Sequence, residues 1–183
     1  LRDAGLHRLT ISLDTLDPAL FARISRVGDV RRVLAGIEAA RREGFAIRIN
    51  MVAMAGLNDA SLLPLADWCE ERGFDLALIE SMPMGQVGPE RAGSHVPLDR
   101  FIAPLLGDGA AVAVPHRTSG PARYVALPGR ALRLGLITPL SDNFCATCNR
   151  IRLTVEGRVY MCLGQDDHVD LRAALREGGD VDG

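Results

Sequence analysis

The first 85 residues alternate between strand-like and helix-like patterns of apolar positions. Every second residue from Leu9 to Leu13 is apolar, which is the period of a half-buried strand. Asp29 is a good N-cap for the helix that follows Gly28, because apolar residues recur after it at helical spacing. The other elements expected in this half are strands at 45–54 and 75–82 and helices ending at Gly44 and Glu71. Strands and helices that alternate with short connections predict a parallel sheet with right-handed crossovers.

Three parallel strands cannot close a barrel, and a parallel sheet needs both of its faces covered. We therefore expect an α/β fold in which residues 1–85 form part of an incomplete TIM-type barrel. In such sheets the chemistry lies beyond the C-terminal ends of the strands. These ends carry Ser12, Asn50 and Met82. Ordinary strand polarity is the alternative explanation for Ser12 and Asn50.

After residue 85 the periodicity fails, and residues 86–183 are expected to form a linker and a smaller α+β lobe. The elements expected there are one helix at 98–106, strands at 122–127 and 131–137 around the turn Pro128–Gly129, and a hairpin of 149–155 with 158–163. If Glu156 and Gly157 are the two turn residues, Val155 faces Arg158 and Ile151 lies opposite Cys162. The Cys145–Cys148 loop then needs only to curl over the hairpin end to bring three sulfurs together.

Three thiolates at one point favour a metal site, because disulfides are improbable in a cytosolic chain. Zinc would require a fourth ligand, for which Cys69, His116 and His168 are available, although Cys69 also fits the apolar face of its helix. A cubic cluster with three cysteine ligands instead leaves one iron open to a substrate atom. Arg150 and Arg152 alternate onto one strand face and could bind phosphate through charge-assisted bonds, with a solvated edge strand as the alternative.

Composition limits the choice of partner. The formal net charge is −2 and the isoelectric point is near 6.1, so the chain lacks the basic surface that bulk nucleic-acid or membrane binding requires. No stretch reaches the roughly 18 apolar residues that a membrane span needs, and no charged-then-apolar leader is present. We therefore expect a cytoplasmic protein. The opening LRDAG is typical of the last turn of a helix, which suggests that sequence upstream is missing.

One string carries a specific resemblance. NFCATCNRIRLT at 143–154, followed by Cys162 and Leu163, resembles the C-terminal cluster motif of the GTP 3′,8-cyclase family. Further segments that resemble this family are ISLD at 11–14, GLND at 56–59, IESMPMG at 79–85, GPARY at 120–124 and DLRAALR at 170–176. The resemblance covers nearly the whole chain in order.

The resemblance implies a radical S-adenosylmethionine (radical SAM) lyase that converts GTP to 3′,8-cyclo-7,8-dihydro-GTP in the first step of molybdopterin biosynthesis. In this family an N-terminal cluster cleaves S-adenosylmethionine, and the resulting radical removes a hydrogen from the ribose of GTP. The resemblance assigns Cys145, Cys148 and Cys162 to a second 4Fe–4S cluster that binds the guanine end of GTP. It assigns Arg150 and Arg152 to holding the substrate.

Further residues match family positions. Arg48 falls where members often carry a basic residue near the triphosphate. Ser12 and Met82 fall at S-adenosylmethionine contacts, and Asn50 lies nearby. The resemblance assigns no catalytic residue. It allows a homodimer, and it implies a downstream pterin synthase that acts on the product.

The sequence departs from the family pattern in two ways. The Cys-x-x-x-Cys-x-x-Cys motif of the radical-generating cluster is absent, because all four cysteines are accounted for above. The chain as printed is therefore not expected to start the radical reaction, and S-adenosylmethionine and that cluster are expected only in a full-length enzyme. Ala77 stands where many members carry a basic residue, while His95 and His116 match no functional residue. The alternatives are another radical SAM enzyme with an auxiliary cluster, and a non-enzymatic zinc-ribbon module.

Overall fold

The computed structural model describes residues 1–82, 93–118, 120–148, 150–162 and 166–176. The chain divides into two compact units, Leu1–Asn143 and Phe144–Gly183, and each is described by itself. The boundary predicted at residue 85 lies outside the described residues and stays a prediction. No helix in the described part of the chain is long and apolar enough to cross a membrane.

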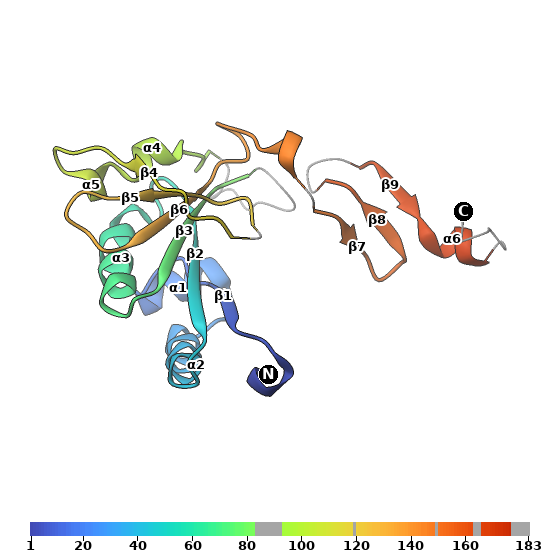
Figure 1. Cartoon of the computed structure of the whole chain (residues 1–183), viewed down its shortest axis with the longest axis horizontal. Helices are drawn as coiled ribbons and strands as arrows, with labels where there is room; N and C mark the ends of the chain where they lie inside the picture. Colours follow the sequence, from blue (N-terminus) through green and yellow to red (C-terminus); the bar gives the residue numbers. More distant parts are fainter. Residues whose placement is uncertain (83–92, 119, 149, 163–165, 177–183) are drawn as a thin grey trace. The chain divides into compact units, whose positions relative to one another are not determined.

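The first unit is built on a six-stranded sheet with the order β1-β2-β3-β6-β5-β4 (Figure 1). The strands are β1 Arg8–Ser12, β2 Ala46–Ala53, β3 Asp75–Glu80, β4 Val112–Ala113, β5 Arg123–Ala126 and β6 Arg133–Ile137. Strands β1, β2, β3 and β6 pair in parallel, and β5 and β4 add to the β6 edge in antiparallel orientation. The mixed α/β architecture with a largely parallel sheet is thereby confirmed.

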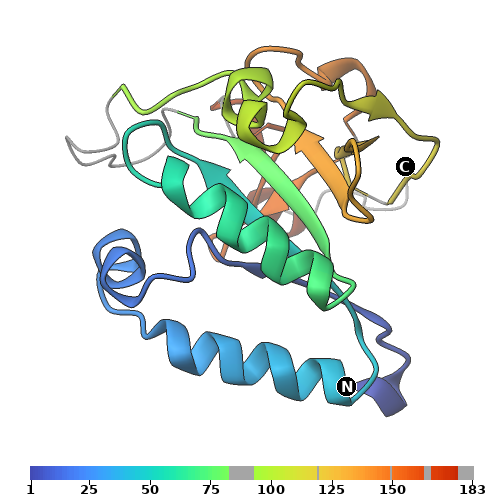
Figure 2. The ribbon, with the colours of Figure 1, turned by 90° about the vertical axis from the view of Figure 1, so that its left-hand side faces the viewer.

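Helices α2 and α3 lie against one face of this sheet (Figure 2). The helical elements of the first unit are η1 Arg2–Ala4, α1 Pro18–Ser25, α2 Val30–Arg42, η2 Asp59–Ser61, α3 Leu62–Glu71, α4 Leu98–Phe101 and α5 Ala103–Leu106. The Asp29 carboxylate caps α2 by accepting from the Arg31 backbone N–H at 2.9 Å, as the sequence predicts. The single helix expected over 98–106 is two short helices instead. Pro104 has no N–H to donate to the preceding turn, which accounts for the break.

The hydrophobic core lies between these helices and the sheet. Alternate β2 residues, Ile47, Ile49 and Met51, are buried in it. Because side chains alternate across a strand, Arg48 and Asn50 lie on the opposite face, which we call the inner face. The helices thus leave a polar row on the side of the sheet that they do not cover.

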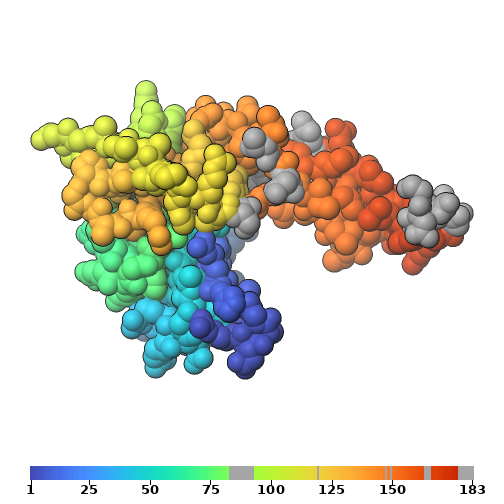
Figure 3. Space-filling view, viewed as in Figure 1, coloured from blue at the N-terminus to red at the C-terminus, as the bar shows by residue number. Residues whose placement is uncertain are grey.

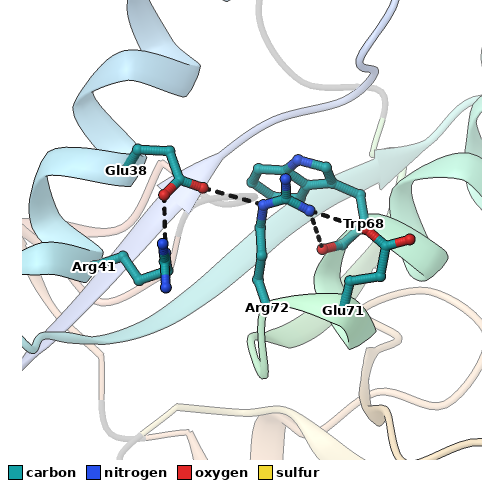
Figure 4. A network of polar contacts seen from close by, with 5 residues as sticks. All are labelled: Glu38, Arg41, Trp68, Glu71 and Arg72. Atoms are coloured by element: carbon teal, nitrogen blue, oxygen red, sulfur yellow. Dashed lines mark hydrogen bonds and ion pairs between the residues drawn. The ribbon is translucent and has the colours of Figure 1, made fainter.

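Polar contacts join α2 to α3 at the protein surface (Figure 4). Glu38 accepts from Arg41 Nε at 2.8 Å and from Arg72 Nε at 3.1 Å. Arg72 also lies over the Trp68 ring at 4.8 Å and donates to Glu71. The hydrogen bonds from Arg41, and then from Arg72, hold the pKa of Glu38 below its usual range. The four charged residues of this network line a shallow hollow and satisfy one another's charges, so we assign the hollow a structural role.

The amino-terminal turn packs against the end of α2, and the two form adjoining parts of the surface (Figure 3). Arg2 Nη1 donates to the Gly44 carbonyl at 2.5 Å, and its guanidinium lies 5.8 Å from the centre of the Phe45 ring. Gly44 has φ 74°, a left-handed conformation that ends the helix as expected.

The second unit contains a three-stranded antiparallel sheet with the order β7-β8-β9 (Figure 1). Its elements are η3 Cys145–Thr147, β7 Arg152–Leu153, β8 Arg158–Tyr160, β9 His168–Asp170 and α6 Leu171–Arg176. The hairpin of β7 and β8 lies within the predicted segment. Strand β9 was not foreseen, because three residues are too few to show a period. Asn149 and Leu163, the outer ends of the predicted hairpin strands, lie outside the described residues.

The predicted hairpin register is wrong by one residue. Gly157 N–H donates to the Thr154 carbonyl at 3.0 Å, and Thr154 N–H donates to the Arg158 carbonyl at 2.9 Å. The loop therefore has three residues rather than two, with Gly157 at φ 82° as the bulge residue. Arg152 pairs with Tyr160, so Val155 does not face Arg158 and the inferred pairing of Ile151 with Cys162 fails. A one-residue shift moves every side chain to the other face relative to its partner strand.

Candidate functional site

Asn58 joins the C-terminal ends of β1 and β2. Its Nδ2 donates to the carbonyls of Val52 at 2.9 Å and Asp14 at 3.2 Å, and its Oδ1 accepts from Met54 N–H at 2.9 Å. Asp14 Oδ1 accepts from Val52 N–H at 2.8 Å. Asn58 is fully buried, so this network is shielded from water. The polar residues of the ISLD and GLND segments thus hold the site end of the sheet in place.

One row of residues crosses the inner face from β1 to β5. Strand pairing sets Ser12 beside Asn50, Asn50 beside Ala77, Ala77 beside Gly135 and Gly135 beside Tyr124. Paired residues share a face, so all five lie on the side away from the core. The structure therefore brings Ser12 and Asn50 together, as the sequence suggested.

Met82 lies two residues after β3 and is half-buried. Met82 and Ser12 thus both lie at the C-terminal end of a parallel strand, β3 and β1 respectively. Among the described residues, no hydrogen bond joins Met82 to Ser12 or Asn50. The last part of the IESMPMG segment, residues 83–85, lies outside them.

Arg48 occupies the next row of the inner face. Its Nη1 donates to Thr118 Oγ1 at 3.3 Å and to the Tyr124 hydroxyl at 3.4 Å, both long bonds to neutral acceptors. Its register neighbour on β3 is Asp75, which instead accepts from Arg133 Nε at 2.6 Å. Within the described residues, no carboxylate forms an ion pair with Arg48. The inner face therefore carries a half-buried cation without a counter-charge.

Three buried side-chain atoms, one of them in Arg48 itself, lack a hydrogen-bond partner within the described ranges. They are Arg48 Nε, Asn50 Oδ1 and His116 Nε2. The His116 ring packs edge-on against Tyr124, with ring centres 4.6 Å apart and planes at 84°. We call Arg48, Asn50, His116, Thr118 and Tyr124 the inner-face cluster. The sequence predicts Arg48 and Asn50 as site residues, but it offers His116 only as a possible zinc ligand, Tyr124 only as part of an expected strand, and Thr118 not at all.

Glu80 fixes the turn that follows β6. It is buried at the end of β3 and accepts from the backbone N–H groups of Leu140 and Ser141, each at 3.0 Å, and from the Ser141 hydroxyl. Burial alone would raise the pKa of Glu80, but these hydrogen bonds outweigh it and hold the pKa below its usual range. Thr138 donates to the Asp142 carbonyl at 3.0 Å within the same turn. These bonds hold the segment that leads into the cysteine motif.

The three predicted cluster ligands all lie in the second unit. Cys148 N–H donates to the Cys145 carbonyl at 3.2 Å, which closes the Cys-x-x-Cys turn, and Cys162 follows β8 by two residues. All three are exposed and none is in a disulfide, so as thiols they suit an iron–sulfur cluster. Within the described residues, no three His, Cys, Asp or Glu side chains are grouped as metal ligands. Convergence of these sulfurs therefore stays a prediction.

Cys69 has a different environment from the other three cysteines. It lies on the buried face of α3, fully buried in the core, and burial raises the pKa of its thiol to about 12. A thiol this hard to ionise is a poor metal ligand. Cys69 therefore acts as a small core side chain.

Arg150 and Arg152 are exposed, and neither forms a hydrogen bond or ion pair with another described residue. Arg158 differs, since it lies 3.6 Å from Glu156 and 4.0 Å from Asp170. The guanidinium groups of Arg150 and Arg152 therefore remain available for an anionic ligand, whereas Arg158 supports the sheet.

Arg152 shares a sheet face with two aromatic rings. Strand pairing sets it beside Tyr160, which in turn pairs with His168. The Tyr160 and His168 rings stack with centres 5.0 Å apart and planes at 26°. His168 Nδ1 lies 2.8 Å from the Asp166 carbonyl, so this candidate zinc ligand has a local partner.

Comparison with protein families gives two matches that together span most of the chain. A model of the family Molybdenum Cofactor Synthesis C matches residues 74–182. A model of the Radical SAM superfamily matches residues 1–69.

Individual relatives match almost the full chain. A protein named GTP 3′,8-cyclase from Rhizobium meliloti (strain 1021) is 51% identical over 180 residues, which cover 98% of this chain and 52% of that protein. Proteins of the same name from Brucella canis (strain ATCC 23365 / NCTC 10854 / RM-666) and Brucella suis biovar 1 (strain 1330) are each 49% identical over 177 residues, covering 97% of this chain and 52% of theirs. The chain thus spans about half the length of the curated relatives it matches.

Proposed function

Because the chain belongs to the molybdenum cofactor synthesis C family, we propose that it supplies the substrate-binding part of a GTP 3′,8-cyclase. This activity is a radical SAM lyase reaction that converts GTP to 3′,8-cyclo-7,8-dihydro-GTP, the first step of molybdopterin biosynthesis. The observation that carries the proposal is a pair of exposed guanidinium groups, Arg150 and Arg152, which have no partner among the described residues and lie in the same small unit as three exposed cysteines.

Within this proposal the two halves of the chain have separate tasks. Residues 1–85 contribute strands to an incomplete barrel, in which Ser12, Asn50 and Met82 contact S-adenosylmethionine. Residues 86–183 form the substrate and cluster domain, where Arg150 and Arg152 bind GTP. Arg48 binds the triphosphate from the inner face, a role supported by the absence of a carboxylate partner for it in the described part of the chain.

Cys145, Cys148 and Cys162 would hold a 4Fe–4S cluster on the hairpin. When bound, a cluster with three thiolate ligands supplies one open iron to a ring atom of the substrate. Their exposure and lack of disulfides support this assignment and a cytoplasmic location. The proposal also includes a homodimer and a pterin synthase that consumes the product.

The cluster assignment is tested by anaerobic reconstitution of the purified chain with iron and sulfide. We expect a brown protein that contains iron and sulfide in equal amounts, and loss of both in Cys148→Ser. Cys69→Ala is the matched control and should bind as much iron as the unmodified chain, because its sulfur is buried in the first unit. A colourless chain that holds one zinc and no iron would reject the cluster and favour a zinc-ribbon module.

The substrate assignment is tested by titrating GTP into the reconstituted chain. Arg150→Ala and Arg152→Ala should each weaken GTP binding at least tenfold, since a hydrogen bond to a charged group contributes about 1.5–3 kcal/mol. Arg172→Ala is the control, because Arg172 is an exposed arginine of the same unit and alanine keeps its Cβ. Equal GTP affinity in all four proteins would remove Arg150 and Arg152 from the site.

A further inference from the structure

The inner-face cluster contains buried polar atoms that form no hydrogen bond with the described residues. Buried polar atoms in folded proteins are almost always hydrogen-bonded. Within the described residues, the buried side-chain atoms that lack a partner are Arg48 Nε, Asn50 Oδ1 and His116 Nε2, and all three belong to this cluster. Their grouping indicates a missing ligand rather than three unrelated defects.

Tyr124 connects two of these residues. Its hydroxyl accepts from Arg48 at 3.4 Å, and its ring forms a T-shaped contact with the His116 ring, with centres 4.6 Å apart. Tyr124 is itself buried at 2% exposure, so its position is fixed by packing. The imidazole and the guanidinium are thus held beside the same aromatic side chain although they are distant in sequence.

Gly135 makes this arrangement possible. A Cβ added to Gly135 would lie 3.3 Å from Tyr124 Cε1 and 3.4 Å from the Cβ of Ala77. The Tyr124 ring therefore lies in space that a side chain on β6 would otherwise contest. Two small residues in the row, Gly135 and Ala77, leave room for it.

The chemistry of the cluster suits an oxygen-rich anion that carries a hydroxyl group. Arg48 offers charged N–H donors, and an imidazole can present Nε2 as a further donor. Asn50 offers an acceptor to a hydroxyl group, as on a sugar. The two acceptors now bound to Arg48 Nη1, Thr118 and Tyr124, are neutral and do not compensate its charge. This set matches a phosphorylated nucleoside better than a metal ion, because it contains no carboxylate or thiolate.

We propose that His116 is a further substrate-binding residue, which donates from Nε2 to a phosphate oxygen of the nucleotide held by Arg48. Tyr124 is the positioning residue for both groups. This assignment rests on the proposed function for the identity of the nucleotide, but it names a residue that the family resemblance does not. Water does not reach the three unpartnered atoms. The segment from Val114 to Thr118 must therefore shift for the phosphate to enter.

The test is calorimetric titration of the purified chain with GTP, inorganic tripolyphosphate and guanosine. His116→Phe keeps an aromatic ring against Tyr124 but removes Nε2. We expect it to weaken binding of GTP and tripolyphosphate by the same factor, roughly tenfold or more, and to leave guanosine binding unchanged. His116→Gln retains a side-chain N–H donor and should recover part of the affinity. His116→Gln also tests the proposal if the His116→Phe variant fails to fold.

His7→Phe is the matched control, because His7 is exposed and precedes the amino-terminal end of β1. Tripolyphosphate affinity in His116→Phe equal to that of the unmodified chain would overturn the proposal, as would an unmodified chain that binds no phosphate compound. Loss of GTP binding in Arg150→Ala, together with unchanged GTP and tripolyphosphate affinity in His116→Phe, would support the proposed function but reject the His116 site. The opposite outcome is also distinguishable. If tripolyphosphate binding depends on His116 but the chain binds ATP as tightly as GTP, the His116 site is supported and GTP is rejected as the substrate.

Discussion

Replacement of Asn58 by alanine should destabilise the first unit more than any exposed polar substitution. Alanine removes three hydrogen bonds, those to the Val52 and Asp14 carbonyls and that from Met54 N–H. Each bond contributes about 1 kcal/mol net, and a buried donor left without a partner costs about 1–3 kcal/mol. Met54 N–H has a single hydrogen and would lose its acceptor. We expect a loss of about 3–5 kcal/mol, a large fraction of the 5–15 kcal/mol typical of a domain.

Urea unfolding followed by tryptophan fluorescence measures this loss. Trp68 is the single tryptophan of the chain, and it packs edge-on against Phe74 with ring centres 5.4 Å apart, so its emission reports on the first unit. With a slope of about 2 kcal/mol per molar urea, the midpoint should fall by about 2 M while the slope stays constant. Asn143→Ala is the control, because Asn143 is exposed, and it should change the free energy of unfolding by less than about 0.5 kcal/mol.

Asn58→Asp separates the hydrogen-bond network from simple loss of volume. Aspartate has nearly the shape of asparagine and can still accept from Met54 N–H, but it turns an acceptor toward the two carbonyls and buries a charge. It should be less stable than Asn58→Ala at pH 7. The difference should shrink in acid, because burial raises the pKa of the new carboxyl and protonation supplies a donor. If Asn58→Asp is as stable as the unmodified chain at pH 7, the network does not stabilise the sheet as argued.

Three further substitutions and measurements follow from the structure. Hydrogen bonds from Ser141 and its neighbour hold the pKa of Glu80 in the folded chain below its unfolded value of about 4.3. These bonds therefore stabilise the fold above that pH, and this stabilisation is lost as the pH falls through the folded pKa. The acid loss of stability, measured by fluorescence from pH 7 to pH 3, should therefore be smaller in Glu80→Gln. Iodoacetamide should modify the three exposed cysteines of the native chain but reach Cys69 only after unfolding, which mass spectrometry detects. Gly157→Ala should loosen the hairpin, because Gly157 has φ 82° and the new Cβ would lie 2.7 Å from the Cβ of Arg172. Hydrogen exchange of the α6 amides should therefore be faster in this variant.

The parts of the fold that the sequence predicted are those in which local signals agree. Strand β2 differs from its predicted range of 45–54 by one residue at each end, because a long alternating run is bounded by Gly44 and a turn. Helix α2 starts where Asp29 predicts it, since the cap and the apolar spacing coincide. Ser12 and Asn50 meet because the C-terminal ends of parallel strands share one edge of a sheet.

The parts that the sequence did not predict depend on long-range pairing or on one backbone angle. The apolar alternation of β6 is as clear as that of β2, but no local feature states that β6 pairs in parallel with β3. The hairpin register depended on whether Gly157 is a turn residue or a bulge, and the sequence string allows both. The relation of His116 and Tyr124 to Arg48 could not be predicted, because it arises only after β5 joins the sheet beside β6.

Ala77 now has an explanation that its sequence position alone did not supply. It lies between Asn50 and Gly135 in the inner-face row, where a long basic side chain would enter the space occupied by the Tyr124 ring. A second cation there would also lie next to the row that holds Arg48, whose charge already lacks a carboxylate partner among the described residues. Ala77 therefore supplies no cation to a ligand on the inner face. It also leaves room for the ring of Tyr124, which contacts both Arg48 and His116.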